Sequence, residues 1–166
     1  QDWQAWSNLG RHLTETGASE EAEEVLRRAA TLAGPDATDP HLRLAELYLA
    51  TGRPTTALVH SERAVTLSGS AEAFYLRGRG YYDVDEPDKA EEDFRRAVLA
   101  DSRHVRARGA IGVIRAEKGD LQAAAENFRQ VVAMDPTNAA ARENLARAEA
   151  LHRQLGFEGA AVAPPG

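Results

Sequence analysis

The stretch FYLRGRGYYDVDEPDKAEEDFRRAV, residues 74–98, predicts two helices joined by a short turn. Phe74, Gly78 and Tyr81 follow the i, i+4, i+7 spacing of one helical face, and the segment DVDEPD interrupts that spacing. Pro87 favours a new helix there, because proline suits a first helical turn. A glycine inside a helix costs about 1 kcal/mol relative to alanine. We therefore expect Gly78 to lie where the two helices cross closely.

This pattern of two helices recurs four times along the chain, with a period of about 34 residues. A glycine or an aspartate marks the turn in each copy, at Gly17, Gly52, Asp85 and Gly119. Three further columns of small residues share the same steps: Ala22, Ala57, Ala90 and Ala124; Ala29, Ala64, Ala97 and Val131; and Gly10, Ala45, Gly78 and Gly112. Four columns with one period are hard to obtain by chance, so the chain is predicted to be an array of helix pairs.

The period divides the chain into units and a remainder. We expect four units at about residues 3–37, 38–70, 71–104 and 105–138, followed by a capping helix at 139–156 and a flexible tail at 157–166. One face of the capping helix is apolar and is expected to cover the last unit. That face consists of Leu145, Ala148, Leu151 and Leu155.

The segment AWSNLGRHLTETGASEEAEEVLRRAATL, residues 5–32, resembles a tetratricopeptide repeat, a helix–turn–helix unit of 34 residues. The family pattern falls on Trp6, Leu9, Gly10, Leu13, Ala22, Leu26 and Ala29. This resemblance implies an all-α fold, a right-handed superhelical α-solenoid of about four such units plus a C-terminal capping helix. The chain departs from the pattern at Ser61, where the family has an aromatic residue, and at Arg108 and Arg115, where it has large apolar residues.

Composition excludes several classes of function. Hydrophobic residues make up 43% of the chain and charged residues 28%, as in a soluble folded protein. The net charge of −6 argues against binding to nucleic acid or to an anionic membrane surface. No apolar run approaches the ~20 residues of a membrane span, so no membrane insertion is expected.

Composition also bears on the compartment of the protein. The chain contains no cysteine, and it begins with Gln1 rather than methionine, as a fragment or a processed form would. An alanine- and arginine-rich chain without cysteine is typical of bacteria. We expect a cytoplasmic location, with a periplasmic or lipoprotein-anchored form after processing as the alternative.

The sequence offers no constellation for catalysis, so we expect neither an enzyme nor a cofactor. The five histidines are expected to lie far apart on different units, and no metal site is predicted. The segment DVDEPD lacks the glycine and glutamate of a calcium loop and is interpreted as a helix-capping turn. No phosphate-binding loop is present.

The family resemblance implies that the first helix of each unit lines a concave groove, at its second, fifth, ninth and twelfth positions. The candidate partner-binding residues at these positions are Leu42, Glu46, Leu49, Tyr75, Arg79, Tyr82, Arg106, Gly109 and Val113. Tyr75 and Tyr82 lie opposite the face of Phe74 and are therefore not expected in the core; the alternative is that they pack on neighbouring helices. Gly109 would leave room for a bulky side chain of the partner.

These residues predict a non-enzymatic adaptor that binds a protein or peptide segment, helical or extended, with apolar anchors and mixed charge. A chaperone-binding carboxylate clamp, known in some members of the family, finds no matching residues here. The alternative is a structural scaffold within a longer repeat protein, or a homo-oligomer that associates through the amino-terminal end. Trp3 and Trp6 favour that alternative, unless Trp6 is core and Trp3 lies at a frayed helix end.

Overall fold

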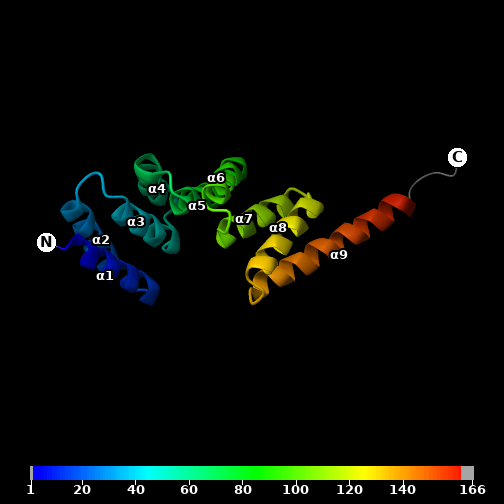
Figure 1. Cartoon of the computed structure of the whole chain (residues 1–166), viewed down its shortest axis with the longest axis horizontal. Coiled ribbons are helices and arrows are strands. Elements are labelled where there is room, and N and C mark those ends of the chain that lie inside the picture. The colour runs from blue at the N-terminus through cyan, green and yellow to red at the C-terminus, as the bar shows by residue number, and fades with distance from the viewer. Residues whose placement is uncertain (1, 162–166) are drawn as a thin grey trace. The chain divides into compact units, whose positions relative to one another are not determined.

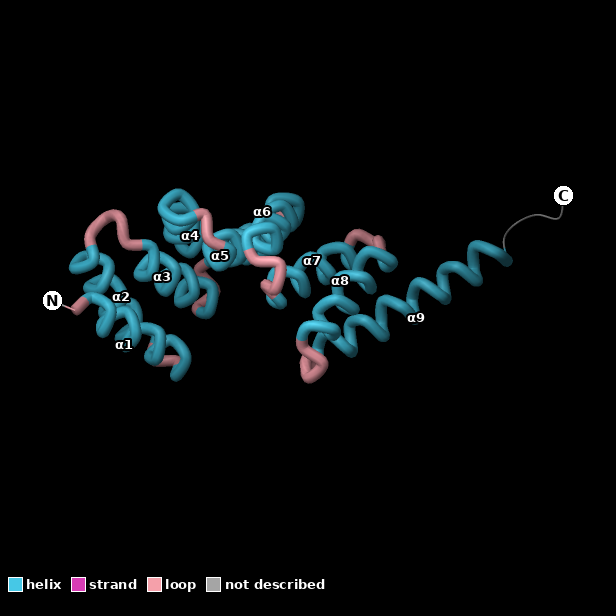
Figure 2. Tube along the Cα trace, viewed as in Figure 1, coloured by secondary structure: helices cyan, strands magenta, loops and turns pink. Residues whose placement is uncertain are grey.

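The computed structural model describes the backbone of residues 2–161 and the side chains of residues 2–156 (Figure 1). The described part is helical throughout, with short turns between helices and no strand (Figure 2). The helices are α1 (Trp3–Thr16), α2 (Ser19–Ala33), α3 (Thr38–Ala50), α4 (Pro54–Ser68), α5 (Ala71–Asp83), α6 (Pro87–Ala100), α7 (Val105–Glu117), α8 (Leu121–Met134) and α9 (Ala139–Ala161). The all-helical repeat fold is confirmed.

The helices form two compact units, Gln1–Ser102 and Arg103–Gly166, each larger than one of the repeats predicted from the sequence. From here on, the first unit and the second unit mean these two parts of the chain. In the first unit, α1 packs on α2, α3 on α4 and α5 on α6, while α2 contacts α3 and α4 contacts α5. The helices α1, α3 and α5 also contact one another in succession. In the second unit, α8 lies between α7 and α9 and packs on both.

Helix boundaries follow local chemistry. The side chains of Ser70 and Asp120 accept hydrogen bonds from backbone amides at the starts of α5 and α8, and Pro87 occupies the first turn of α6. Asp85 adopts a φ of 61°, the left-handed conformation that glycines take at the equivalent turns. Asp85 therefore occupies the turn position of its repeat both in sequence and in conformation.

One helix end differs from the sequence prediction. Helix α9 continues to Ala161, beyond the tail expected from residue 157. Gly156 and Gly159 lie within the helix, and proline, the strongest helix breaker, first occurs at Pro164. Residues 162–166 of the expected tail lie outside the described part of the chain.

The column of small residues marks the closest helix crossings. A side chain placed on Gly78 would lie 2.7 Å from the ring of Phe94 on α6, and one on Gly112 would lie 2.7 Å from the ring of Phe128 on α8. Both rings are buried. The predicted close crossing at Gly78 is confirmed, and the bulky residue of the second helix fills the space that the glycine leaves.

The amino-terminal helix has a partly open face. Trp6 is half-buried, with the Arg28 guanidinium 4.4 Å from its ring centroid, and Trp3 is also half-buried. Leu9 is exposed, whereas its counterpart Leu44 one repeat later is buried. An additional partner of α1 at the amino-terminal end stays a prediction.

Candidate partner-binding site

The predicted groove residues of the first unit lie on two neighbouring helices, α3 and α5. The α3 helix carries Leu42, Glu46 and Leu49, and α5 carries Tyr75, Arg79 and Tyr82. Because α3 and α5 contact each other, these six residues share one region of the unit. Arg106, Gly109 and Val113 lie on α7 in the second unit. Their role in binding a partner stays a prediction.

Charges on α3 are largely satisfied within the protein. The Arg43 guanidinium donates to Glu46 at 3.0 Å and pairs with Asp39 at 3.3 Å. Burial alone would lower the pKa of Arg43, but the hydrogen bond and charge of Glu46, together with Asp39 and Glu72, raise it. Leu49 is buried and Leu42 is half-buried. The α3 helix thus offers a partner little unpaired charge and modest apolar surface.

The expectation that Tyr75 lies outside the core was wrong. Tyr75 is only 8% exposed, and its ring centroid lies 5.8 Å from that of Phe94. The physical reason is Gly78: its missing side chain lets the Phe94 ring lie across α5, where it reaches Tyr75 one turn earlier. Tyr82, two turns further on, is exposed, and Arg79 is half-buried.

In the second unit, Arg106 is exposed and Gly109 is half-buried. The nearest atom to a side chain placed on Gly109 would be 4.0 Å away, on Val131, so Gly109 is not required for helix packing. Val113 is half-buried and packs against the cluster of Ala124, Ala125, Phe128 and Ala148. It also faces an open space between α7 and α9.

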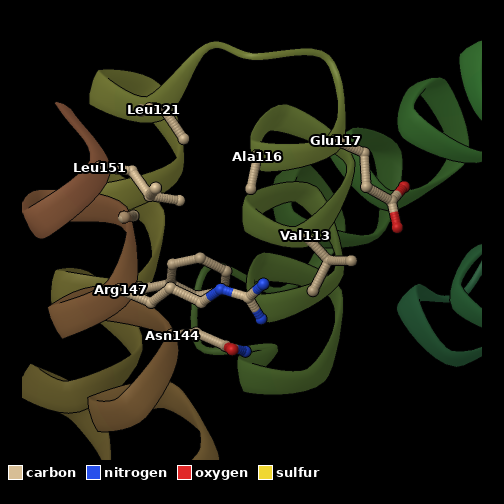
Figure 3. A pocket seen from close by; sticks show the side chains of 9 residues that line it. Val113, Ala116, Glu117, Leu121, Asn144, Arg147 and Leu151 are labelled. Carbon is tan, nitrogen blue, oxygen red and sulfur yellow. The ribbon is translucent and has the colours of Figure 1, made fainter. Parts of the chain in front are cut away.

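This space is a cavity of about 340 Å³ lined by all three helices of the second unit (Figure 3). Its apolar walls are Val113, Ala116, Leu121, Phe128, Ala148 and Leu151. Its polar lining consists of Glu117, Asn144 and Arg147. Among the predicted groove residues, Val113 is the one that lines it.

The lining residues of α9 were not expected to form a site, because the apolar face of this helix was predicted only to cover the last unit. The capping role applies to the first half of the helix, where Ala148 is buried and Leu145 packs on the core cluster. Leu151 is 40% exposed and Leu155 is 57% exposed, so this end of the apolar face is not covered. The signal in the sequence was the spacing of Asn144, Arg147 and Leu151, which places polar and apolar groups on one helical face.

A surface salt bridge joins α9 to α8. Arg129 on α8 lies 2.8 Å from Glu126 on its own helix and 2.8 Å from Glu149 on α9. These charges raise the pKa of Arg129, the hydrogen bond to Glu149 most strongly. The wall of the cavity that α9 forms is therefore held mainly by the apolar cluster, and this exposed ion pair adds little.

The expected separation of the histidines was wrong for one pair. His41 on α3 and His60 on α4 have their Nδ1 atoms 3.1 Å apart, because the two helices of this repeat pack face to face. Tyr48 is buried and stacks on His60, with ring centroids 5.4 Å apart. Among residues 2–156, no group of three or more potential metal ligands converges.

No helix in the described residues is long and apolar enough to cross a membrane.

The chain resembles several known proteins. Over 69 residues it is 36% identical to Protein bimA of Emericella nidulans; the match covers 42% of this chain and 9% of that protein. The structure of the pilF protein of Pseudomonas aeruginosa has a TM-score of 0.84 at 19% identity, covering 92% of this chain and 69% of that one. The second TPR domain of human RPAP3, solved in complex with an HSP70 peptide, has a TM-score of 0.63 at 23% identity, covering 70% of this chain and 98% of that one.

The sequence model of the tetratricopeptide repeat matches residues 1–40, 75–139 and 116–156. These matches include more than half of the chain, and they agree with the paired helices, the left-handed turn residues and the glycine crossings described above. The chain therefore belongs to the tetratricopeptide repeat family.

Proposed function

We propose that this chain is a non-enzymatic adaptor that binds a segment of a partner protein, with the cavity between α7 and α9 in the second unit as the main anchoring point. Tetratricopeptide repeat domains are in general protein–protein interaction modules and are typically not catalytic. The observation that carries the proposal is the cavity itself, because it has apolar walls and an open mouth. Interfaces concentrate binding energy where an apolar side chain fills such a pocket.

The size of the cavity suits a side chain of a partner. A cavity of about 150 Å³ inside a protein is enough to hold a benzene molecule. The observed cavity of about 340 Å³ would therefore admit a large apolar side chain and part of its neighbour. The peptide bound by the RPAP3 domain supports a peptide-like partner for this chain as well.

The first unit offers a separate candidate surface on α3 and α5. Tyr82 offers an exposed aromatic ring on α5, and Leu42 adds half-buried apolar surface on α3. Tyr75 contributes less, because its ring is occupied by the contact with Phe94. Leu42, Arg79 and Tyr82 are therefore the residues of the first unit that we propose for partner binding.

A matched pair of leucine variants tests the proposal. Leu151 lines the cavity at 40% exposure, and Leu99 on α6 is 86% exposed and does not line it. Cross-linking and affinity capture from cells of the source organism should recover a partner with the wild-type chain and with Leu99→Glu. Leu151→Glu should lose that partner, because it replaces part of the apolar wall of the cavity with a charged group.

Circular dichroism would verify that both variants stay folded, as their exposure predicts. Capture that is equal for the two folded variants would contradict the cavity as the anchoring point. A partner retained by Leu151→Glu and lost in Tyr82→Ala would move the main anchoring point to the first unit.

A further inference from the structure

The cavity between α7 and α9 has a cation at its mouth that the protein does not neutralise. Arg147 on α9 is exposed, and it makes no ion pair or hydrogen bond with any residue in the described part of the chain. Two other arginines of the second unit are paired: Arg115 lies 3.2 Å from Asp120, and Arg129 bridges to α9. The hydrogen-bond donors of Arg147 are therefore open to a ligand.

Asn144 places a second donor beside this guanidinium. It lies one turn before Arg147 on the same face of α9, and Figure 3 shows both polar groups directed toward the space beside Val113 on α7. A guanidinium presents five N–H donors and a carboxamide two. Donors grouped in this way match the two oxygens of a carboxylate.

The charged side chains on the two walls of the cavity differ in sign and in orientation. Glu117 on α7 also lines the cavity, and its carboxylate points away from Arg147 in Figure 3. Arg147 is therefore the charged side chain that points into the cavity, from the side of α9. The cavity floor between them is apolar, with Phe128 and Ala148 both buried.

We infer that this cavity binds a partner segment in which a large apolar side chain lies next to an aspartate or glutamate. The apolar side chain fills the cavity, and the carboxylate accepts hydrogen bonds from Arg147 and Asn144. This inference rests on the proposed adaptor function and specifies the chemistry of the partner. The net charge of the chain is −6, so its overall field does not attract an acidic ligand, and selectivity depends on these two side chains.

A pair of small probes isolates this chemistry. The probes are 3-phenylpropionate, which has an aromatic ring and a carboxylate, and 3-phenylpropanamide, in which a neutral amide replaces the carboxylate. The full chain is titrated with each probe, and NMR shifts of the methyl groups of Val113 and Ala148 and of the Asn144 carboxamide are followed. Ligands of this size are expected to bind with a millimolar Kd. The carboxylate should bind about tenfold more tightly than the amide.

Two arginine variants complete the test. Arg147→Gln should reduce the preference for the carboxylate to near unity, whereas Arg153→Gln should preserve it. Arg153 is the matched control, because it is also exposed on α9 but does not line the cavity. Both residues are at the surface, so both variants should fold.

Equal binding of the two probes, or a preference that survives Arg147→Gln, would overturn carboxylate recognition while leaving an apolar anchoring site. Absence of binding by either probe would overturn the inference altogether. The adaptor function fails separately, through equal partner capture by the Leu151→Glu and Leu99→Glu variants. Each failure is therefore recognised by its own measurement.

Discussion

At the scale of single residues, helix crossings depend on complementary volumes at two repeated positions. Gly78 faces Phe94 and Gly112 faces Phe128. The second repeat differs at both positions: Ala45 replaces the glycine, and the small, buried Ser61 replaces the aromatic residue. A larger residue on one helix is thus accompanied by a smaller one on the other, which keeps the helices closely packed.

This complementarity predicts opposite effects for two glycine substitutions. Gly78→Ala should lower the free energy of unfolding by about 1–2 kcal/mol, because the cost of overpacking against Phe94 exceeds the gain in helix propensity. Gly109→Ala should raise it by roughly 0.5–1 kcal/mol, because the nearest atom is 4.0 Å away and only the propensity changes. Urea unfolding of both variants measures the difference. A stabilising Gly78→Ala would show that the crossing tolerates a methyl group.

At the scale of elements, the contact between α3 and α4 contains the histidine pair. The ring centroids of His41 and His60 are 5.4 Å apart and their Nδ1 atoms 3.1 Å apart, so the nitrogens face each other almost along the line between ring centres. One proton suffices for this hydrogen bond, and a proton on each Nδ1 would break it. Burial lowers the pKa of both histidines; Arg63 lowers that of His41 further, and His41 and Arg27 lower that of His60.

The direction of these shifts predicts how stability depends on pH. Histidines in the unfolded chain titrate near pH ~6.5, whereas the folded pair titrates lower. Below about pH 6.5 the unfolded state therefore binds more protons, and the free energy of unfolding falls as the pH falls through this range. Glu23 opposes part of this effect, because its charge raises the pKa of His60.

Thermal unfolding at about pH 7.5 and about pH 5.5 measures the effect. His60→Gln should make the melting temperature less sensitive to this change in pH than that of the wild type. The control is His12→Gln, at an exposed position on α1, which should retain the wild-type sensitivity. Equal sensitivity in all three proteins would remove the histidine pair as its source.

The elements also show what the sequence could and could not predict. The helix pairs, the turn at Asp85 and the crossing at Gly78 follow from periodicity, because each depends on residues close together in the chain. The burial of Tyr75 and the contact between His41 and His60 depend on how a side chain of one helix lies on another, which spacing does not encode. The cavity was missed for the same reason: only the packing of α9 on α8 closes its wall.

At the scale of the whole molecule, we expect a core substitution to destabilise neighbouring helices more than distant ones. In the first unit, α1 packs on α2 and α3, and α5 packs on α4 and α6, as expected for stacked repeats in which each contacts its neighbours. A substitution in one helix pair is therefore expected to change the stability of a distant pair only through the helices between them. A core substitution in α2 should act most strongly on α1 and α3.

Leu26→Ala provides this test, because Leu26 is completely buried against Gly10. Its loss should cost about 2–5 kcal/mol locally. Hydrogen exchange followed by mass spectrometry should show faster exchange in α1, α2 and α3, and much smaller changes in α5 and α6.

Phe94→Ala is the reciprocal variant. It should accelerate hydrogen exchange most in α5 and α6, because Phe94 packs against Gly78 and Tyr75. Uniform acceleration across residues 3–100 in either variant would show that this unit unfolds in one cooperative step.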